Sequence, residues 1–282
     1  MKNKRLANSD GFSVIEMVAV IAIIAILVAL LIPALNMAYE MANTVRQRAQ
    51  FSSIESALEA FRTDFGDYPQ SYENGYTCGS LPDTYCGAQK LAEAIVGYDA
   101  FGFHPDSVFS RHNTTDQCDE AALGPVYDYT DPTNLDKRKG LYLELETANA
   151  VKLQSLYASS GGLVGVLKAD TYILADTFSK VKNKATQKQT GMPILYYKAD
   201  TSKFNHSPDP AALDSNIYDV RDNEQIANLL SLYPPEKFYE HTLNPNFVSP
   251  PRPYRAETFI LQSAGPDGLY GNGDDVFNFD AK

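Results

Sequence analysis

The feature that most constrains this chain is an uninterrupted apolar run near its N-terminus. The 19 residues from Met17 to Leu35 carry no charged or hydrogen-bonding side chain. A helix that crosses the hydrocarbon core of a bilayer needs about 20 such residues at about 1.5 Å each. The run therefore predicts a membrane-spanning helix. The basic residues Lys2, Lys4 and Arg5 precede it, which favours a cytoplasmic N-terminus.

Three interpretations of this N-terminal segment compete. A secretory signal peptide has a shorter apolar region and a small-residue cleavage site after it, whereas here the chain continues with helical character through NMAYEMANTVRQRAQ. A plain signal anchor accounts for the length of the run but not for Glu16, because a carboxylate at the end of an apolar span is costly and usually has a functional partner. The third interpretation accounts for both features and depends on a short motif.

The motif is the segment Gly11-Phe12-Ser13-Val14-Ile15-Glu16, which resembles the prepilin peptidase site of type IV pilin-like proteins, G/F-(S/T)-x-x-E. The resemblance implies that residues 1–11 are a leader, removed on the cytoplasmic side after Gly11, and that the new amine on Phe12 is methylated. It also implies that Glu16 pairs with the N-terminal amine of a neighbouring subunit during assembly, since a buried carboxylate needs a cation.

The helix is expected to continue beyond the apolar run, from about Phe12 to Phe65. Pro33 lies within it at a position where pilin helices commonly carry a proline, which removes one helix hydrogen bond. Gly66 and Pro69 are expected to end it. Apolar residues recur at spacings of four, three and four and form one face of an amphipathic helix: Ile54, Leu58, Phe61 and Phe65.

Residues 57–70, ALEAFRTDFGDYPQ, indicate a particular group within the type IV pilin-like proteins. They are similar to the AL-x-x-Y-x-x-D-x-G-x-YP stretch of the major pseudopilin of type II secretion, with Phe61 in the aromatic position. The matching residues are Asp64, Gly66, Tyr68 and Pro69. Without this resemblance, the glycine and proline predict an ordinary helix exit.

The resemblance implies an α+β pilin fold, in which the long helix packs on a small antiparallel sheet. The chain then divides into a leader (1–11), the membrane and polymerisation half of the helix (12–35) and a periplasmic head (36–282), which contains a large loop-rich insertion at roughly 98–255. The periodicity and the turn residues predict the elements of the head. Helices are expected at 88–95 and 223–232, and strands at 141–145, 171–175, 193–198 and 257–262.

Residues 263–277 read SAGPDGLYGNGDDVF and combine four glycines with three aspartates. Calcium prefers six to eight oxygen ligands from carboxylates, carbonyls and water. The EF-hand pattern is absent, but the loop resembles the calcium loop near the C-terminus of the major pseudopilin. That resemblance implies side-chain ligands from Asp267, Asp274 and Asp275 and a carbonyl ligand from Ala264, with Phe277 as a further carbonyl. The alternative is a glycine- and aspartate-rich turn without an ion.

The chain has three cysteines, Cys78, Cys86 and Cys118, and no CxxC pair. A zinc site is therefore not predicted. Outside the cytoplasm a disulfide between Cys78 and Cys86, which flank a short loop, is one interpretation. Three unpaired thiols are the other.

The sequence gives little indication of nucleic-acid binding, histidine metal sites or catalysis. The net charge of −11 disfavours nucleic acid as a partner, the four histidines have no metal-ligand spacing, and no nucleophile, metalloprotease or nucleotide motif appears. We therefore expect no enzymatic activity.

The resemblance implies a structural subunit of a type II secretion pseudopilus, with its head periplasmic and a single helix in the bacterial inner membrane. Its partners would be copies of itself, the prepilin peptidase, other pseudopilins and the inner-membrane assembly platform. A pilin of a surface type IV pilus is the first alternative. A binding domain that uses the N-terminus only as a tether is the second. The head is larger than is typical of the major pseudopilin.

Overall fold

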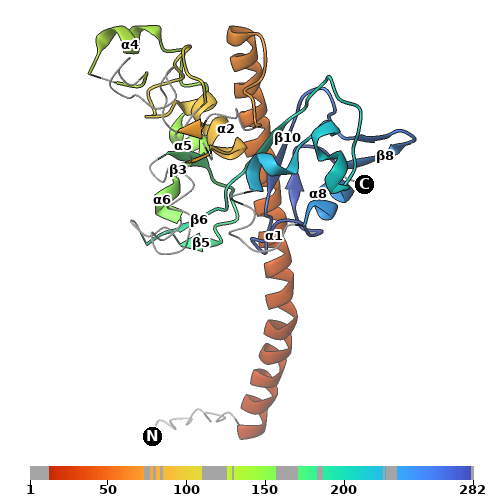
Figure 1. Ribbon diagram of the computed structural model, residues 1–282. Coiled ribbons are helices and arrows are strands. Elements are labelled where there is room, and N and C mark those ends of the chain that lie inside the picture. The colour runs from red at the N-terminus through yellow and green to blue at the C-terminus, as the bar shows by residue number, and fades with distance from the viewer. Residues whose placement is uncertain are drawn as a thin grey trace, which may run out of the picture. The chain divides into compact units, whose positions relative to one another are not determined.

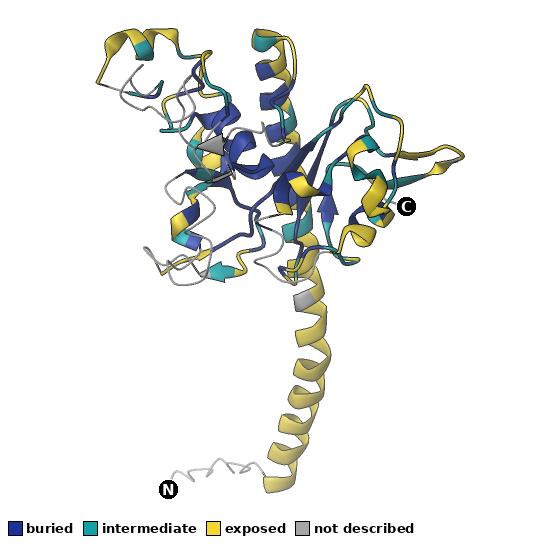
Figure 2. Cartoon of the chain, viewed as in Figure 1, coloured by how far each residue is buried: buried dark blue, intermediate teal, exposed yellow. Residues whose placement is uncertain are grey.

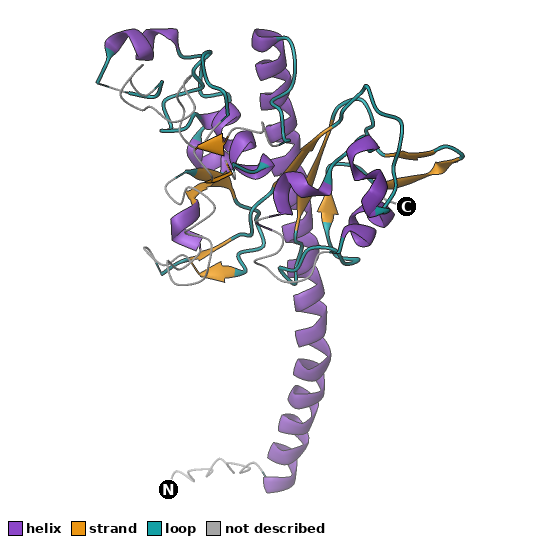
Figure 3. Ribbon diagram, viewed as in Figure 1, coloured by secondary structure: helices purple, strands orange, loops and turns teal. Residues whose placement is uncertain are grey.

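The computed structural model describes a protein of mixed helix and sheet, with one long N-terminal apolar helix and small antiparallel sheets (Figure 1 and Figure 3). The chain divides into two units, Met1–Ala42 and Asn43–Lys282, and each is described by itself. The described residues are 13–72, 77–78, 81–82, 85–109, 126–128, 130–156, 171–182, 187–224, 226 and 234–280.

Apart from α1, most of the elements in the described part of the chain are brief. Their bounds are α1 Val14–Phe65, β1 Thr77–Cys78, β2 Leu81–Pro82, α2 Gly87–Val96, α4 Pro132–Lys137, α5 Leu145–Ala148, β3 Ala150–Lys152, α6 Leu153–Leu156, β4 Tyr172–Leu174, β5 Val181–Lys182, β6 Gln189–Thr190, β7 Leu195–Lys198, 3-10 helices η1 Pro210–Ser215 and η2 Val220–Asn223, α8 Pro235–Thr242, β8 Leu243–Val248, β9 Pro251–Pro253, β10 Phe259–Ser263 and β11 Val276–Phe277.

Helix α1 is a single element of 52 residues that continues through Pro33. This confirms the expected helix. Its apolar stretch is long and apolar enough to cross a membrane, and the side chains from Val14 to Leu35 are exposed. A helix that is apolar all round requires an apolar environment, so this part of α1 is a candidate membrane span.

The second part of α1 belongs to the core of the larger unit, where its inner face is buried (Figure 2). Phe51, Ile54 and Leu58 are at most 2% exposed, and they pack in one cluster with Leu91 and Ile95 of α2. Burying each of these side chains stabilises the fold by about 1.5–3 kcal/mol. The predicted apolar face of the helix is confirmed at Ile54, Leu58 and Phe61, which are buried, whereas Phe65 is only partly buried.

The central sheet has three antiparallel strands in the order β11-β10-β7. Ile260 of β10 pairs with Tyr197 of β7, and Gln262 pairs with Phe277 of β11. Alternate residues face opposite sides of a strand. Tyr196 and Leu261 accordingly join the cluster around α1, whereas their neighbours Tyr197 and Ile260 join a second cluster. Both faces of the sheet are therefore covered, which explains why β7 and β10 are almost continuously apolar.

Most predicted elements of the head appear within one or two residues of their expected bounds. Helix α2 confirms the helix at 88–95, and β4, β7 and β10 confirm three of the strands. The helix expected at 223–232 falls mainly outside the described residues. Within them, η2 ends at Asn223.

The strand predicted at 141–145 is wrong. Tyr142 is drawn away from an extended course, because its backbone N–H donates to the carbonyl of Ile95 and its hydroxyl donates to Asp64 at 2.7 Å. The strand that pairs with β4 is instead β3, Ala150–Lys152.

The proposed boundary of the insertion also needs correction. Strand β7 lies within 98–255 in sequence but belongs to the central sheet. The same stretch contains short helices and the β8–β9 hairpin, which the sequence did not predict as elements.

Candidate functional site

The first candidate site is the start of α1, where Ser13 and Glu16 bond to each other. The backbone N–H of Ser13 donates to Glu16 Oε2 at 2.9 Å, and the Ser13 hydroxyl donates to the same oxygen at 2.8 Å. The backbone N–H of Glu16 in turn reaches Ser13 Oγ at 3.3 Å. This is the reciprocal arrangement of a capping box, which satisfies donors that a helix N-terminus leaves without partners.

The capping box gives Glu16 a role inside its own chain that the sequence interpretation missed. The signal was present, because Ser-x-x-Glu before an apolar run is the sequence signature of this cap. Gly11 and Phe12, the predicted cleavage and methylation site, lie outside the described residues.

The second candidate site is the acidic loop, residues 263–277, which follows β10. Gly265 has a φ of +66°, and a Cβ at this position would lie 2.1 Å from the carbonyl oxygen of Asp274. Only glycine allows this close approach. The approach brings together the two arms of the loop, and the backbone N–H of Asp267 donates to Asp274 Oδ2 at 3.0 Å.

The three aspartates of the acidic loop do not converge on one point. Asp267 accepts from the Leu269 N–H at 2.7 Å and from Asn272 Nδ2 at 2.6 Å. Asp275 faces the sheet instead, where its Oδ2 accepts from Gln262 Nε2 and from the Gly271 N–H, each at 2.8 Å.

Burial and like charge both act on the carboxyls of the acidic loop. Burial raises the pKa of Asp275 to about 7, and the charges of Asp274 and Asp267 add to the increase. Burial also raises the pKa of Asp274, with a further contribution from Asp267. The second carboxylate oxygen of Asp275, Oδ1, is buried and has no hydrogen-bond partner among the described residues.

These features fit a cation only in part. Within the described ranges, no group of three or more histidine, cysteine, aspartate or glutamate side chains is gathered so that it could hold a metal ion. The structure brings Asp267 and Asp274 together and places the buried Ala264 on the same loop. The side chain of Asp275 instead points toward Gln262 of the central sheet, away from the position that a shared cation would need.

A buried carboxylate beside the acidic loop was not predicted. Asp176 is fully buried, and its Oδ2 accepts from the Ser263 hydroxyl at 2.7 Å. Its Oδ1 accepts from the N–H groups of Phe178 and Met192, both at 3.1 Å. Burial raises the pKa of Asp176 to about 6. No local pattern around this residue signals it.

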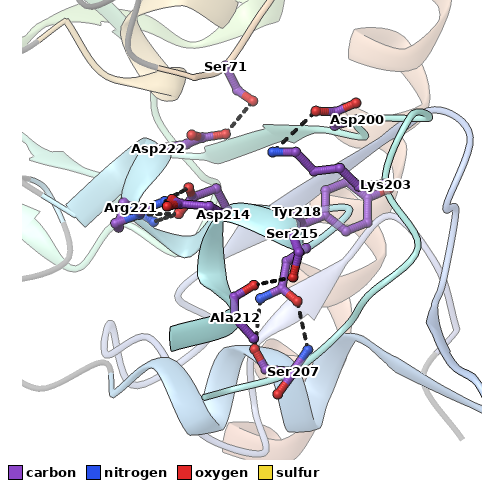
Figure 4. Close-up of polar contacts among 12 residues, drawn as sticks. Ser71, Asp200, Lys203, Ser207, Ala212, Asp214, Ser215, Tyr218, Arg221 and Asp222 are labelled. Carbon is purple, nitrogen blue, oxygen red and sulfur yellow. Dashed lines mark hydrogen bonds and ion pairs between the residues drawn. The ribbon is translucent and has the colours of Figure 1, made fainter. Parts of the chain in front are cut away.

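Another unpredicted carboxylate, Asp222 of η2, faces Ser71 in the segment that follows α1 (Figure 4). The Ser71 hydroxyl donates to Asp222 Oδ2 at 2.5 Å and accepts from the Lys198 N–H at 2.8 Å. Burial raises the pKa of Asp222 to about 7. The contact ties the segment after the helix to β7. Nearby, Lys203 forms a surface ion pair with Asp200 at 3.2 Å.

The residues after α1 that resemble the pseudopilin stretch have structural contacts. The Tyr68 hydroxyl donates to Glu59 at 2.5 Å, and the Tyr196 hydroxyl donates to the carbonyl oxygen of Pro69 at 2.6 Å. Asp67 forms an ion pair with Lys198. These contacts hold the corner between the helix and the sheet.

Cys86 is a buried free thiol at the start of α2, and burial raises its pKa to about 11. The predicted disulfide with Cys78 is therefore not formed in this structure. The side chain of Cys78 and the whole of Cys118 lie outside the described residues.

Comparisons with known protein families, with curated proteins and with solved structures found no match for this chain.

Proposed function

We propose that this chain is a type IV pilin-like filament subunit, with the major pseudopilin of type II secretion as its nearest resemblance. The observation that carries the proposal is helix α1, which runs without interruption from the apolar candidate span into the core of the head. A tethered binding domain needs only a flexible linker after its anchor. An unbroken helix instead suits a subunit whose anchor also becomes its packing element in a polymer.

The sequence around the start of α1 supports the same proposal. The basic leader, Gly11-Phe12 and Glu16 stand in the order of a prepilin processing site. On this proposal the head faces the periplasm, the leader is cytoplasmic, and the subunit assembles with copies of itself and other pseudopilins on an inner-membrane platform. A surface type IV pilus is the second candidate, because the same processing motif serves both kinds of filament.

We also propose that the acidic loop binds calcium. Asp267 and Asp274 lie together, and mutual repulsion contributes to the raised pKa values of Asp274 and Asp275. A divalent cation would relieve this repulsion and could bind Asp275 Oδ1, which has no hydrogen-bond partner among the described residues. Carbonyl oxygens of the loop, with Ala264 and Phe277 as candidates, would complete the ligand set. Because Asp275 faces Gln262, its recruitment would require the side chain to turn.

Processing at Gly11 tests the proposed function directly. The chain should be expressed in a bacterium that carries a prepilin peptidase, extracted from the membrane and measured by intact mass. We expect loss of residues 1–11 and the gain of one methyl group on Phe12. Gly11→Val should leave the leader attached, because a side chain blocks close approach of the peptidase to the backbone. A mature N-terminus after residue 35 would instead identify a secreted protein and contradict the proposal.

A further inference from the structure

Two adjoining hollows lie beside the β8–β9 hairpin of the head. The larger hollow has a volume of about 610 Å³ and includes Phe204 in its lining. The smaller has a volume of about 240 Å³ and includes Phe247. Both hollows are bordered by Arg252, Ala256 and Glu257. They therefore form one continuous concave surface, which we call the hairpin groove.

The hairpin groove exposes large apolar side chains. Phe204 is 79% exposed and Phe247 is 51% exposed, and Ile217 and Pro250 add further apolar lining to the larger hollow. A single exposed apolar residue is ordinary, but two exposed phenylalanines that border connected hollows indicate a surface that another molecule covers. Aromatic residues of this kind are enriched at protein interfaces.

Arg252 lies between the two hollows and has donors to spare. Its side chain is 46% exposed, and among the described residues its one ionic contact is an ion pair with Glu257 at 3.5 Å. Lys203, in the lining of the larger hollow, pairs with Asp200 at 3.2 Å in a similar way. Exposed pairs add little stability, so either cation can exchange its carboxylate for another. The groove therefore suits a partner that brings a carboxylate and an apolar side chain together.

The acidic loop presents this combination at its tip. Asp267 and Leu269 are exposed, whereas Gly268 and Tyr270 are buried, and Leu269 is 48% exposed. The tip is held in place, because the Tyr270 hydroxyl donates to the carbonyl oxygen of Pro193 and the Leu269 N–H donates to Asp267. A segment that is already ordered loses less conformational entropy when it binds.

We propose that the acidic loop of one copy docks in the hairpin groove of a second copy, with Leu269 in the larger hollow and the Asp267 carboxylate against Arg252. The net charge of −11 makes a second copy an acidic partner for these cations. The loop and the groove share no residue, so the contact is heterologous and can repeat from copy to copy. The inference rests on the proposed filament for its setting, but a contact between heads requires neither leader processing nor assembly through α1.

The test uses an equal mixture of ¹⁴N- and ¹⁵N-labelled full-length chain in detergent, with a chelator present so that calcium plays no part. A carbodiimide joins a carboxylate to an amine in contact with it, and mass spectrometry identifies the joined peptides. We expect links between Asp267 and Lys203 in which one peptide carries ¹⁴N and the other carries ¹⁵N. Such mixed pairs form only between two copies.

Two variants test whether the mixed pairs depend on the groove. Arg252→Glu and Leu269→Ser should each reduce the mixed pairs at least about fivefold, as expected for the loss of a central interface residue. Both residues are exposed, so the variants should fold like the wild type. The matched controls Lys237→Glu and Leu135→Ser change an exposed cation and an exposed leucine elsewhere, and they should keep the yield of the wild type.

The absence of mixed Asp267–Lys203 pairs in the wild type would overturn the proposal, as would pairs that carry a single isotope only. Mixed pairs that survive Arg252→Glu and Leu269→Ser would show that the loop meets Lys203 outside the groove. If one variant does not fold, the other variant and the wild-type result decide the question. Processing at Gly11 tests the filament proposal separately, so either proposal can fail while the other stands.

Discussion

At the scale of single residues, Glu16 has two competing partners. In the chain by itself its carboxylate accepts two hydrogen bonds from Ser13. In the proposed filament it would pair with the N-terminal amine of a neighbouring subunit. Both partners supply donors to the same carboxylate, but only the second holds subunits together. The two roles can be separated by mutation.

We expect Glu16→Ala to insert into the membrane normally and to assemble poorly. Loss of one member of a buried ion pair costs about 3–5 kcal/mol, because the other charge is stranded. Ser13→Ala removes only the cap, which costs about 0.5–2 kcal/mol, and should leave more filament than Glu16→Ala does. The measurement is the yield of sheared filaments relative to membrane-bound subunit. Equal yields from Glu16→Ala and wild type would show that Glu16 serves the cap alone.

At the scale of elements, the head depends on the buried face of α1. Leu58 of α1 is fully buried and packs in one cluster with side chains of α2. Leu58→Ala therefore leaves a cavity and also removes apolar contacts. We expect this change to lower the free energy of unfolding by about 2–5 kcal/mol, as measured by denaturant titration with tyrosine fluorescence. Leu135→Ala is the matched control, since Leu135 is 39% exposed, and its effect should stay within about 0.5 kcal/mol. A similar loss in both variants would argue against the packing described.

The acidic loop is an element whose stability should depend on calcium. A ligand that binds only the folded state stabilises it by RT ln(1 + [L]/Kd), or about 2.7 kcal/mol at a hundredfold excess over Kd. The full chain should therefore melt higher in calcium than in chelator. Asp267→Ala and Asp274→Ala should each remove this difference, whereas Asp209→Ala, at an exposed acid elsewhere, should keep it.

Magnesium should replace calcium poorly, because it requires a tighter octahedron and retains its waters. Calorimetry that detects no calcium binding to the folded chain would leave the acidic loop as a turn, stabilised by its own amide and side-chain donors.

At the scale of the whole molecule, buried carboxyls couple folding to pH. Burial raises the pKa of Asp222 to about 7 and that of Asp176 to about 6, above the value of about 3.9 expected in an unfolded chain. Because the folded-state pKa is the higher one, the folded chain binds more protons between these values. The contribution of Asp222 and Asp176 to the free energy of unfolding is therefore fully present below about pH 4. It is lost as the pH rises through their folded-state pKa values.

Asp222→Asn should therefore reduce the loss of unfolding free energy between about pH 4 and pH 7 relative to the wild type. The measurement is a series of urea titrations across this range. Asp209→Asn, at an exposed position, should follow the wild type. If Asp222→Asn and wild type have parallel pH profiles, Asp222 is ionised in the folded chain throughout this range.

Much of the fold could be predicted because it follows from local patterns. The apolar run and the spacing of Ile54 and Leu58 led to α1 and to its buried face, and runs such as residues 259–262 led to strands of the central sheet. The same local approach failed at 141–145. That segment alternates like a strand, but Tyr142 lies in a bend and contacts Asp64 and Ile95, which are distant in sequence.

The candidate sites also combine features that local sequence patterns predict with features that depend on tertiary contacts. The sequence by itself determined the helix, the acidic loop and the position of Glu16, because helix periodicity, glycine turns and capping motifs act over a few residues. Only the tertiary structure decided which carboxyls are buried and that Asp275 faces Gln262 rather than Asp267. Burial and pairing depend on segments that meet only after folding, and no short pattern in the chain encodes that meeting.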